Sequence, residues 1–324
     1  MDARPPLLSI EDLSVSFHTE HGIVRAVDRV SLQVDAGETL AIVGESGSGK
    51  SVTALSILGL LADNARISGG RTRFDGVDLR SLSDAELRGI RGNRIAMIFQ
   101  EPMSSLNPVL TIGRQVAEPI WLHQGKSWEQ ALDGAAELLN RVTIPDARER
   151  LDQYPHHFSG GMRQRVMIAM ALACNPRLII ADEPTTALDV TVQAQILELL
   201  KNLTRETGAA LILITHDLGV VARYAERVAV MYAGRIIETA PARTLYANPS
   251  HPYTRGLLAA VPSLTGKPGS RLTTIPGQPP NLARLPPGCA FAPRCPHVRA
   301  ACRAAVPPLT EIAPQHTCAC IGYE

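Results

Sequence analysis

The stretch Gly44-Glu45-Ser46-Gly47-Ser48-Gly49-Lys50-Ser51 has the spacing G-x-x-x-x-G-K-S and lies between two apolar runs. Residues 39–43 before it are short and β-prone, and residues 52–58 after it have the pattern of a helix. A strand, a glycine-rich loop and a helix in this order form a phosphate-binding loop. The glycines let backbone N–H groups turn towards phosphate oxygens, and the helix adds its positive N-terminal end.

Two side chains of this phosphate loop have predicted roles of their own. Lys50 would reach the β- and γ-phosphates of a nucleoside triphosphate, and the Ser51 hydroxyl would bind Mg²⁺. The alternative is a glycine-rich turn that matches by chance, and the flanking strand and helix argue against it. The loop therefore predicts a nucleotide-binding protein.

The bulk composition favours an α/β protein without a membrane span. Its 324 residues suit one and a half to two domains, and 45 % hydrophobic with only 4 % aromatic residues predicts an aliphatic core, as in a parallel sheet. The net charge of +1 does not indicate a polyanion-binding surface. No uncharged stretch exceeds twelve residues, and Met1 to Pro6 lack the layout of a signal peptide. We expect a cytosolic chain, or one attached to a membrane only through partners.

The chain divides into a core, an insertion and a tail. Residues 7–34 predict an antiparallel β layer, and residues 101–158 a helical insertion in the α/β core. Fifteen of the 24 prolines lie in the last 84 residues, which argues against regular helices and sheet there. We therefore expect a domain over residues 1–245 and a small irregular extension over residues 246–324, which needs a staple or a partner.

Two adjacent carboxylates follow an apolar run that predicts a strand. In an open parallel sheet the ligand lies at the carboxyl ends of the strands. Asp182 would hold Mg²⁺ there, and Glu183 would accept a proton from the attacking water. The alternative is a pair of surface acids, which the phosphate loop in the same chain makes the weaker interpretation.

Other polar residues stand at predicted strand or helix ends. His216 would contact a γ-phosphate, and Gln100 would bind Mg²⁺ or orient water. Ser159-Gly160-Gly161 opens a helix and forms a second anion site, which hints at a site that serves a neighbouring molecule. Phe17 is either a core residue or a ring on which a nucleotide base stacks.

Cysteine placement is uneven, because five of the six cysteines lie between Cys289 and Cys320 and only Cys174 lies elsewhere. In a reducing compartment this favours a metal or a cluster over disulfides. Four thiolates suit an iron–sulfur cluster or zinc, and gaps of five and six residues after Cys289 and Cys295 are longer than usual for zinc.

Six motifs stand in the order found in ATP-binding-cassette (ABC) ATPases, and this resemblance covers about residues 8–240. They are the phosphate loop, Gln100, the signature Ser159-Gly160-Gly161-Met162-Arg163-Gln164, Asp182-Glu183, Ala187-Leu188-Asp189 and His216. The resemblance implies that two subunits dimerise head to tail, with ATP between the phosphate loop of one and the signature, including Gln164, of the other. It places Asp189 at the dimer seam and implies that Phe17 stacks on adenine.

Further motifs resemble the ATPase subunits of dipeptide and oligopeptide importers. They are residues 45–53, residues 99–108 and His251-Pro252-Tyr253-Thr254. The residues Val52-Thr53 resemble the first of two paired ATPase types, so the resemblance implies a related second ATPase subunit as partner. It also implies two integral membrane permease subunits, an extracytoplasmic peptide-binding protein, and a peripheral location on the cytoplasmic face of the inner membrane.

The tail resembles the C-terminal extension of the same family, whose members can carry a [4Fe–4S] cluster. The matching positions are Cys289, Cys295 and Cys302, with Cys320 as fourth ligand and Cys318 as its alternative. Zinc is the alternative to the cluster. The resemblance therefore predicts a Mg²⁺-dependent ATPase that powers peptide import. One alternative is import of another solute such as nickel. The other is a soluble ABC ATPase that acts on DNA or ribosomes, but the sequence shows no coiled-coil insertion, tandem cassette or basic patch that would favour it. We therefore expect no nucleic-acid partner.

Overall fold

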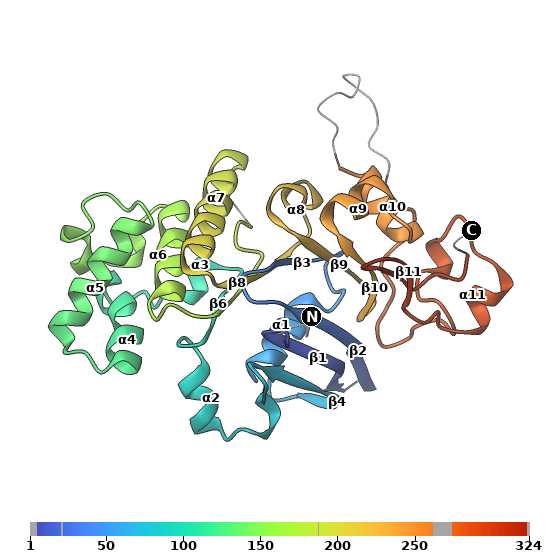
Figure 1. The fold of residues 1–324 in the computed structure, drawn as a ribbon, viewed down its shortest axis with the longest axis horizontal. Helices are drawn as coiled ribbons and strands as arrows, with labels where there is room; N and C mark the ends of the chain where they lie inside the picture. The colour runs from blue at the N-terminus through green and yellow to red at the C-terminus, as the bar shows by residue number, and fades with distance from the viewer. Residues whose placement is uncertain (1–4, 21, 187, 262–273, 323–324) are drawn as a thin grey trace. The chain divides into compact units, whose positions relative to one another are not determined.

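The computed structural model describes residues 5–20, 22–186, 188–261 and 274–322 (Figure 1). The chain forms two compact units. The first comprises Met1–Val34, Thr39–Arg80 and Ile214–Glu324, and the second comprises Asp35–Glu38 and Ser81–Leu213. Each unit is described by itself.

The first unit contains two sets of paired strands. Its strands are β1 Leu8–Thr19, β2 Gly22–Val34, β3 Thr39–Val43, β4 Ala65–Phe74, β5 Val77–Asp78, β9 Arg227–Tyr232, β10 Arg235–Pro241, β11 Thr310–Ala313 and β12 His316–Cys318. One set has the order β2-β1-β4-β5 and is antiparallel throughout, which confirms the predicted β layer. In the other, β3 pairs in parallel with β9, and β10, β12 and β11 follow outward in antiparallel register.

The helices of the first unit are short. They are α1 Lys50–Ile57, α8 Leu218–Tyr224, α9 Ala242–Ala247, α10 Pro252–Ala259, α11 Ala300–Ala304 and the 3₁₀ turn η4 Ala292–Arg294. Helix α1 contacts β1 and β2, and α9 contacts β9 and β10. A further 3₁₀ turn, η1 Leu79–Ser81, and strand β8 Ala210–Thr215 contain the boundaries between the two units.

The imperfect alternation of β1 has a local cause. Ile10 and Leu13 are both buried although they lie three residues apart, and the pairing with β2 shifts register between them. Asp12 has a φ of 49°, so one extra residue is accommodated in a bulge. The bulge returns Leu13 and Val15 to the buried face, and the strand continues with its apolar side inward.

The second unit consists of parallel strands and a helical subdomain. Its elements, besides β8, are β6 Ile95–Ile98, β7 Leu178–Asp182, α2 Asp84–Ile90, α3 Pro102–Ser105, α4 Ile112–Gln124, α5 Trp128–Arg141, η2 Glu149–Asp152, η3 Pro155–His157, α6 Gly160–Leu172 and α7 Val190–Thr207. Strand β7 pairs in parallel with β6. Helices α4, α5 and α6, green in Figure 1, pack on one another.

Local sequence signals explain where several of these helices begin. Ser83 accepts a hydrogen bond from the backbone N–H of Glu86, and the Glu86 carboxylate accepts one from the Ser83 N–H, which together form a capping box at the start of α2. Ser127 and Gln130 do the same at α5. Residues Pro102–Ser105 form one helical turn, α3, near the start of the predicted helical insertion.

The C-terminal extension contains more regular structure than its prolines predicted. Helices α10 and α11 and the strand pair β11–β12 lie within it, and β12 extends the pairing of β10. Proline does not prevent this because Pro252 is in the first turn of α10, where its missing N–H has no helical partner to lose. Residues 274–288 have no helix or strand, as the many prolines of the extension predicted.

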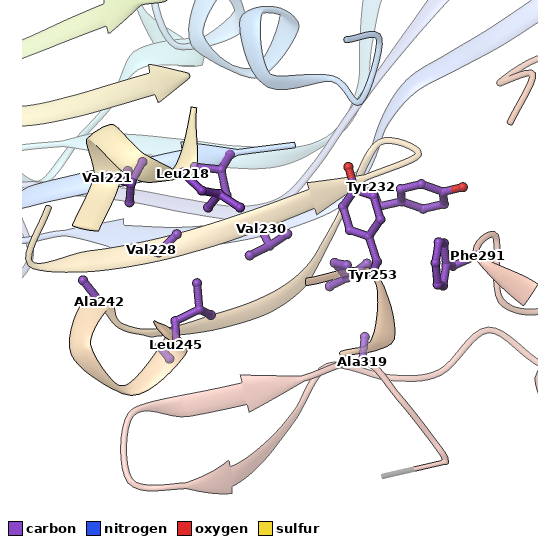
Figure 2. Packing of buried hydrophobic residues seen from close by; sticks show 14 of the residues in the cluster. Leu218, Val221, Val228, Val230, Tyr232, Ala242, Leu245, Tyr253, Phe291 and Ala319 are labelled. Carbon is purple, nitrogen blue, oxygen red and sulfur yellow. The ribbon is translucent and has the colours of Figure 1, made fainter. Parts of the chain in front are cut away.

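The extension finds the partner it needs in the rest of the chain. Figure 2 shows Tyr253 clustered with Tyr232 of β9 and Phe291 of the extension, and Ala319 belongs to the same buried cluster. The ring centroids of Tyr253 lie 4.5 Å from Tyr232 and 5.4 Å from Phe291. Aromatic rings at this spacing bury large apolar areas and add favourable edge contacts. Tyr253 and Phe291 of the extension therefore share one hydrophobic core with Tyr232 of β9.

A buried carboxylate fastens three segments of the first unit. Glu238 of β10 is 0 % exposed, and its carboxylate accepts hydrogen bonds from the backbone N–H groups of Ser250 (2.6 Å) and His251 (2.9 Å). One carboxylate oxygen lies 2.8 Å from Nε2 of His316 in β12. A charge buried without partners is very costly, and these contacts compensate for it.

We expect Glu238→Ala to lower the free energy of unfolding by about 3 kcal/mol, because it leaves two backbone donors and His316 buried without an acceptor. Urea unfolding of the purified chain measures the loss. Glu226, exposed in the same unit, supplies the control: Glu226→Ala is expected to change stability by less than about 0.5 kcal/mol. Equal stability of the two variants would show that Glu238 does not hold the segments together.

Candidate nucleotide-binding and catalytic site

The phosphate loop has the predicted setting, with β3 ending at Val43 and α1 beginning at Lys50. Two of its glycines are required by close approaches. Gly44 has a φ of 154°, and a Cβ there would lie 2.2 Å from the carbonyl oxygen of Met231. At Gly49, with a φ of 105°, a Cβ would lie 2.5 Å from the carbonyl oxygen of Ala26. Any larger residue would push the loop away from β9 and β2.

The loop presents polar groups suited to phosphate. The buried Lys50 ammonium donates to the carbonyl oxygens of Gly44 (2.8 Å) and Glu45 (3.0 Å), so it lies over the loop itself. The Ser48 hydroxyl is buried and has no hydrogen-bond partner in the described part of the chain. Buried polar groups are nearly always satisfied, so this hydroxyl favours a ligand in the loop. Ser51 is half-buried in the first turn of α1.

The carboxylates of the second unit lie where β7 ends. Asp182 is the last residue of β7 and is buried. Glu183 has a φ of 45°, a left-handed conformation that is uncommon for residues other than glycine. Its Oε2 accepts hydrogen bonds from Nε2 of Gln100 (3.0 Å) and from the Thr186 hydroxyl (2.9 Å). The structure thus brings Gln100 and Glu183 together and fixes the direction of the Glu183 carboxylate.

The signature residues open helix α6. The Ser159 hydroxyl caps the helix by accepting a hydrogen bond from the Met162 N–H (3.3 Å). Gly160 and Gly161 are the first two helical residues, so their N–H groups belong to the unsatisfied donors of a helix start. Gln164 is buried, and its side-chain nitrogen has no hydrogen-bond partner in the described structure. The helix start therefore retains the character of an anion site.

The remaining predicted site residues lie on or beside several different helices and strands. Asp189 caps α7 through a hydrogen bond from the Val192 N–H to its Oδ1 (2.9 Å), a structural role that the sequence interpretation did not include. Ala187 of the same motif lies outside the described residues. His216 directly follows β8 and is exposed. Phe17 is half-buried in β1 opposite Val24.

Two residues that contact the predicted site residues were not predicted from the sequence. Thr186 orients Glu183, and a hydroxyl three residues after a carboxylate at a strand end is a signal that could have found it. Arg294 of the extension pairs with Glu45 of the phosphate loop, at 2.7 Å between Nη1 and Oε2. No local pattern links residues so far apart in the chain.

The cysteines of the extension are all free thiols. Four of them line one small cavity, and they are the four predicted ligands Cys289, Cys295, Cys302 and Cys320. Cys318 lies in β12, is 0 % exposed and does not line this cavity, and burial raises the pKa of its thiol. Among the described residues, no group of three or more His, Cys, Asp or Glu side chains is arranged to hold a single metal ion.

Comparisons with known proteins decide the family. Residues 27–186 match the ABC transporter family model, and residues 237–302 match the model of the oligopeptide/dipeptide transporter C-terminal region. The oligopeptide transport ATP-binding protein OppD of Salmonella typhimurium is 54 % identical, over 97 % of this chain and 93 % of that protein. The chain belongs to the family of ATP-binding subunits of oligopeptide and dipeptide ABC transporters. A putative peptide import ATP-binding protein of Brucella abortus is also 54 % identical, over 99 % of this chain and 98 % of its own length.

Solved structures confirm the predicted fold class, an ABC ATPase core. A dimeric ATP-binding cassette bound to ADP and Pi in a post-hydrolysis state superposes with a TM-score of 0.65 and 32 % identity, over 73 % of this chain and 99 % of that one. A subunit of a Clostridium perfringens ABC transporter complex superposes with a TM-score of 0.64 and 27 % identity, over 76 % and 92 % of the two chains. The family places the phosphate loop, the signature and the Glu183 carboxylate in an ATPase.

Proposed function

We propose that this protein hydrolyses ATP to power the import of dipeptides or oligopeptides through an ABC transporter. One observation carries the proposal: a phosphate loop with a buried, inward-held lysine occurs in the same chain as a C-terminal region of the oligopeptide/dipeptide type. The peptide-import names of relatives that span nearly the whole chain support the same cargo.

The residues at the strand ends divide the work at ATP and magnesium. Lys50 would bind the β- and γ-phosphates, and Ser51 and Asp182 would hold Mg²⁺, with Gln100 as a further ligand. Glu183 would take the proton of the attacking water, since two donors already direct its carboxylate and its left-handed backbone indicates a constrained functional position. His216 would contact the γ-phosphate, and Phe17 would stack on adenine.

The signature residues would serve the ATP of a second subunit. The capped start of α6 supplies donors for phosphate, and Gln164 follows them in the same helix. The second subunit would be a related but different ATPase, with Asp189 at the seam between the two.

We expect Ser159→Ala to reduce hydrolysis at the site formed by the phosphate loop of the partner subunit about tenfold, because it removes both a phosphate donor and the cap of α6. Single-turnover hydrolysis in the assembled complex, with the phosphate loop of this chain inactivated, isolates that site. Unchanged hydrolysis there would refute a role in trans.

The membrane partners follow from the same function. No helix in the described ranges is long and apolar enough to cross a bilayer. We infer that two permease subunits and an extracytoplasmic peptide-binding protein complete the transporter, with this chain bound peripherally at the cytoplasmic face of the inner membrane. The helical insertion over residues 101–158 would transmit the motion of the ATPase to the permeases.

The chain would consist of an ATPase domain, residues 1–245, and the C-terminal extension, residues 246–324. The extension would carry a [4Fe–4S] cluster. The donor set fits, since four thiols line one cavity and a cluster takes four cysteines. Cys320 would be the fourth ligand, since it lines this cavity and Cys318 does not. An anaerobic absorption spectrum with iron and zinc analysis distinguishes the two groups.

Cargo uptake by the purified complex tests the proposed function. Proteoliposomes that contain the complex and internal ATP are supplied with labelled peptides of two to eight residues, or with nickel. We expect ATP-dependent uptake of peptides that excess unlabelled peptide abolishes and nickel does not. Uptake of nickel without uptake of any peptide would replace the proposed cargo.

A further inference from the structure

Two residues of the C-terminal extension hold the first variable residue of the phosphate loop. The guanidinium of Arg294 contacts both carboxylate oxygens of Glu45, at 2.7 Å from Nη1 and 2.9 Å from Nη2. The Tyr253 hydroxyl accepts a hydrogen bond from the backbone N–H of Glu45 at 2.8 Å. The extension thus forms hydrogen bonds with both the side chain and the backbone of Glu45.

The Arg294 side chain is buried and held by several contacts besides the one with Glu45. Its side chain is 6 % exposed, against 24 % for that of Glu45, and its Nε donates to the Pro276 carbonyl oxygen at 3.0 Å. The guanidinium lies 5.9 Å from the ring centroids of both Tyr232 and Phe291. Guanidinium remains charged under all ordinary conditions, and a two-point pair with carboxylate also fixes geometry. Arg294 therefore neutralises Glu45 permanently and in one orientation.

Tyr253 is equally well placed. It is 0 % exposed, and its backbone N–H donates to Nδ1 of His251 at the start of α10 (3.1 Å). Burial lowers the pKa of His251 to about 4, so that ring stays neutral and keeps its acceptor at physiological pH. The tyrosine of the His251-Pro252-Tyr253-Thr254 motif, drawn in Figure 2, thereby reaches the phosphate loop from a rigid helix start.

The extension also borders the mouth of the loop. A cavity of about 160 Å³ is lined by loop residues 45–48 and by Pro279, Pro280 and Leu282 of the extension. The first half of the phosphate loop and this part of the extension therefore face the same cavity.

The electrostatic consequence concerns nucleotide affinity. A carboxylate in a loop that binds a triphosphate repels the phosphates, and this repulsion is strongest where water is excluded. Paired with Arg294, Glu45 contributes no net charge. Without the arginine, the loop would carry an uncompensated negative charge and a side chain free to swing towards the ligand.

We propose that Arg294 and Tyr253 are positioning residues for the phosphate loop, and that through Glu45 they make the C-terminal extension a working part of the ATP site of its own chain. The inference rests on the proposed ATP-binding function. It assigns a role to the extension that does not depend on the transported cargo.

A double-mutant cycle tests the proposal in the full chain, with the magnesium complex of AMP-PNP as the probe. We expect Arg294→Met to raise the dissociation constant at least about fivefold, in the range usual for coupling between sites. Glu45→Gln removes the repelling charge, so the Glu45→Gln/Arg294→Met double variant should bind at least about threefold more tightly than Arg294→Met alone. Arg284→Met, at an exposed arginine of the same extension, is the matched control and should bind normally.

Rescue by Glu45→Gln is the decisive readout, because damage to the extension or its cysteines would not be repaired by a change in the phosphate loop. In the assembled transporter, Arg294→Met should raise KM for ATP with kcat within about twofold. A double variant that binds as poorly as Arg294→Met, or an Arg294→Met variant that binds normally, would overturn the proposal.

Tyr253→Phe provides a second variant that keeps the ring packing and removes only the hydroxyl. We expect its dissociation constant for AMP-PNP to rise about threefold and its unfolding midpoint to fall slightly, because the Glu45 N–H loses its acceptor. Unaltered affinity in Tyr253→Phe would overturn the role of Tyr253, and it decides the proposal alone if Arg294→Met does not fold. Failure of the unchanged protein to bind AMP-PNP at all would instead refute the proposed ATPase function.

Discussion

Glu183→Gln is expected to lower ATP turnover by at least about a hundredfold while leaving ATP binding within about twofold of the unchanged protein. Glutamine has the same shape, and its side-chain oxygen can still accept from Gln100 and Thr186, whose donors hold Glu183 at 3.0 and 2.9 Å. It cannot accept the proton of the attacking water, and general-base catalysis contributes about 10²–10⁴-fold. Phosphate release and nucleotide binding in the assembled complex measure the two effects separately.

A second glutamate provides the control for that substitution. Glu206 of α7 is exposed, and Glu206→Gln is expected to keep normal turnover. Normal turnover in Glu183→Gln would show that another group accepts the proton. Loss of binding together with turnover would show instead that Glu183 supports the fold of the site.

Lys50→Ala is expected to weaken binding of the magnesium complex of ATP about a hundredfold or more. The lysine supplies the charge that faces the phosphates, and each charge-assisted hydrogen bond that is lost is worth about 1.5–3 kcal/mol. The substitution also removes the ties from Nζ to the Gly44 and Glu45 carbonyl oxygens, so the loop loses an internal brace. Equilibrium titration with AMP-PNP measures the affinity.

The matched control for this change is Lys126→Ala, since Lys126 is exposed in the other unit. It should bind nucleotide normally. Binding by Lys50→Ala at wild-type affinity would mean that Gly44 to Ser51 is a glycine-rich turn with no nucleotide role.

Sequence alone predicts features whose cause is local. The phosphate loop is predictable because Gly44 and Gly49 stand where the backbone admits no Cβ, and that requirement is visible in the residues themselves. The capping box at Ser83 and the turn between β9 and β10 at residues 233–234 are local in the same way. Each of these features is settled within a few residues of chain.

Features that depend on distant contacts were not predictable. Arg294 and Glu45 lie 249 residues apart, and Tyr253 and Glu45 lie 208 residues apart. Strand β12 is only three residues long, so its pairing with β10 depends on tertiary contacts such as that between His316 and Glu238 rather than on its own propensity. The prolines of the extension suggested a segment without regular structure because their positions at helix starts cannot be read from composition.

Coupling between ATP hydrolysis by this chain and peptide uptake is the central claim, and one reconstitution tests it directly. The permeases, the peptide-binding protein, the second ATPase subunit and this chain are assembled in proteoliposomes, and uptake of a labelled oligopeptide is followed with ATP on the cytoplasmic side. We predict ATP-dependent uptake that stops when only this chain carries Glu183→Gln. Peptide uptake at the wild-type rate with that variant in place would contradict the claim that this chain powers transport.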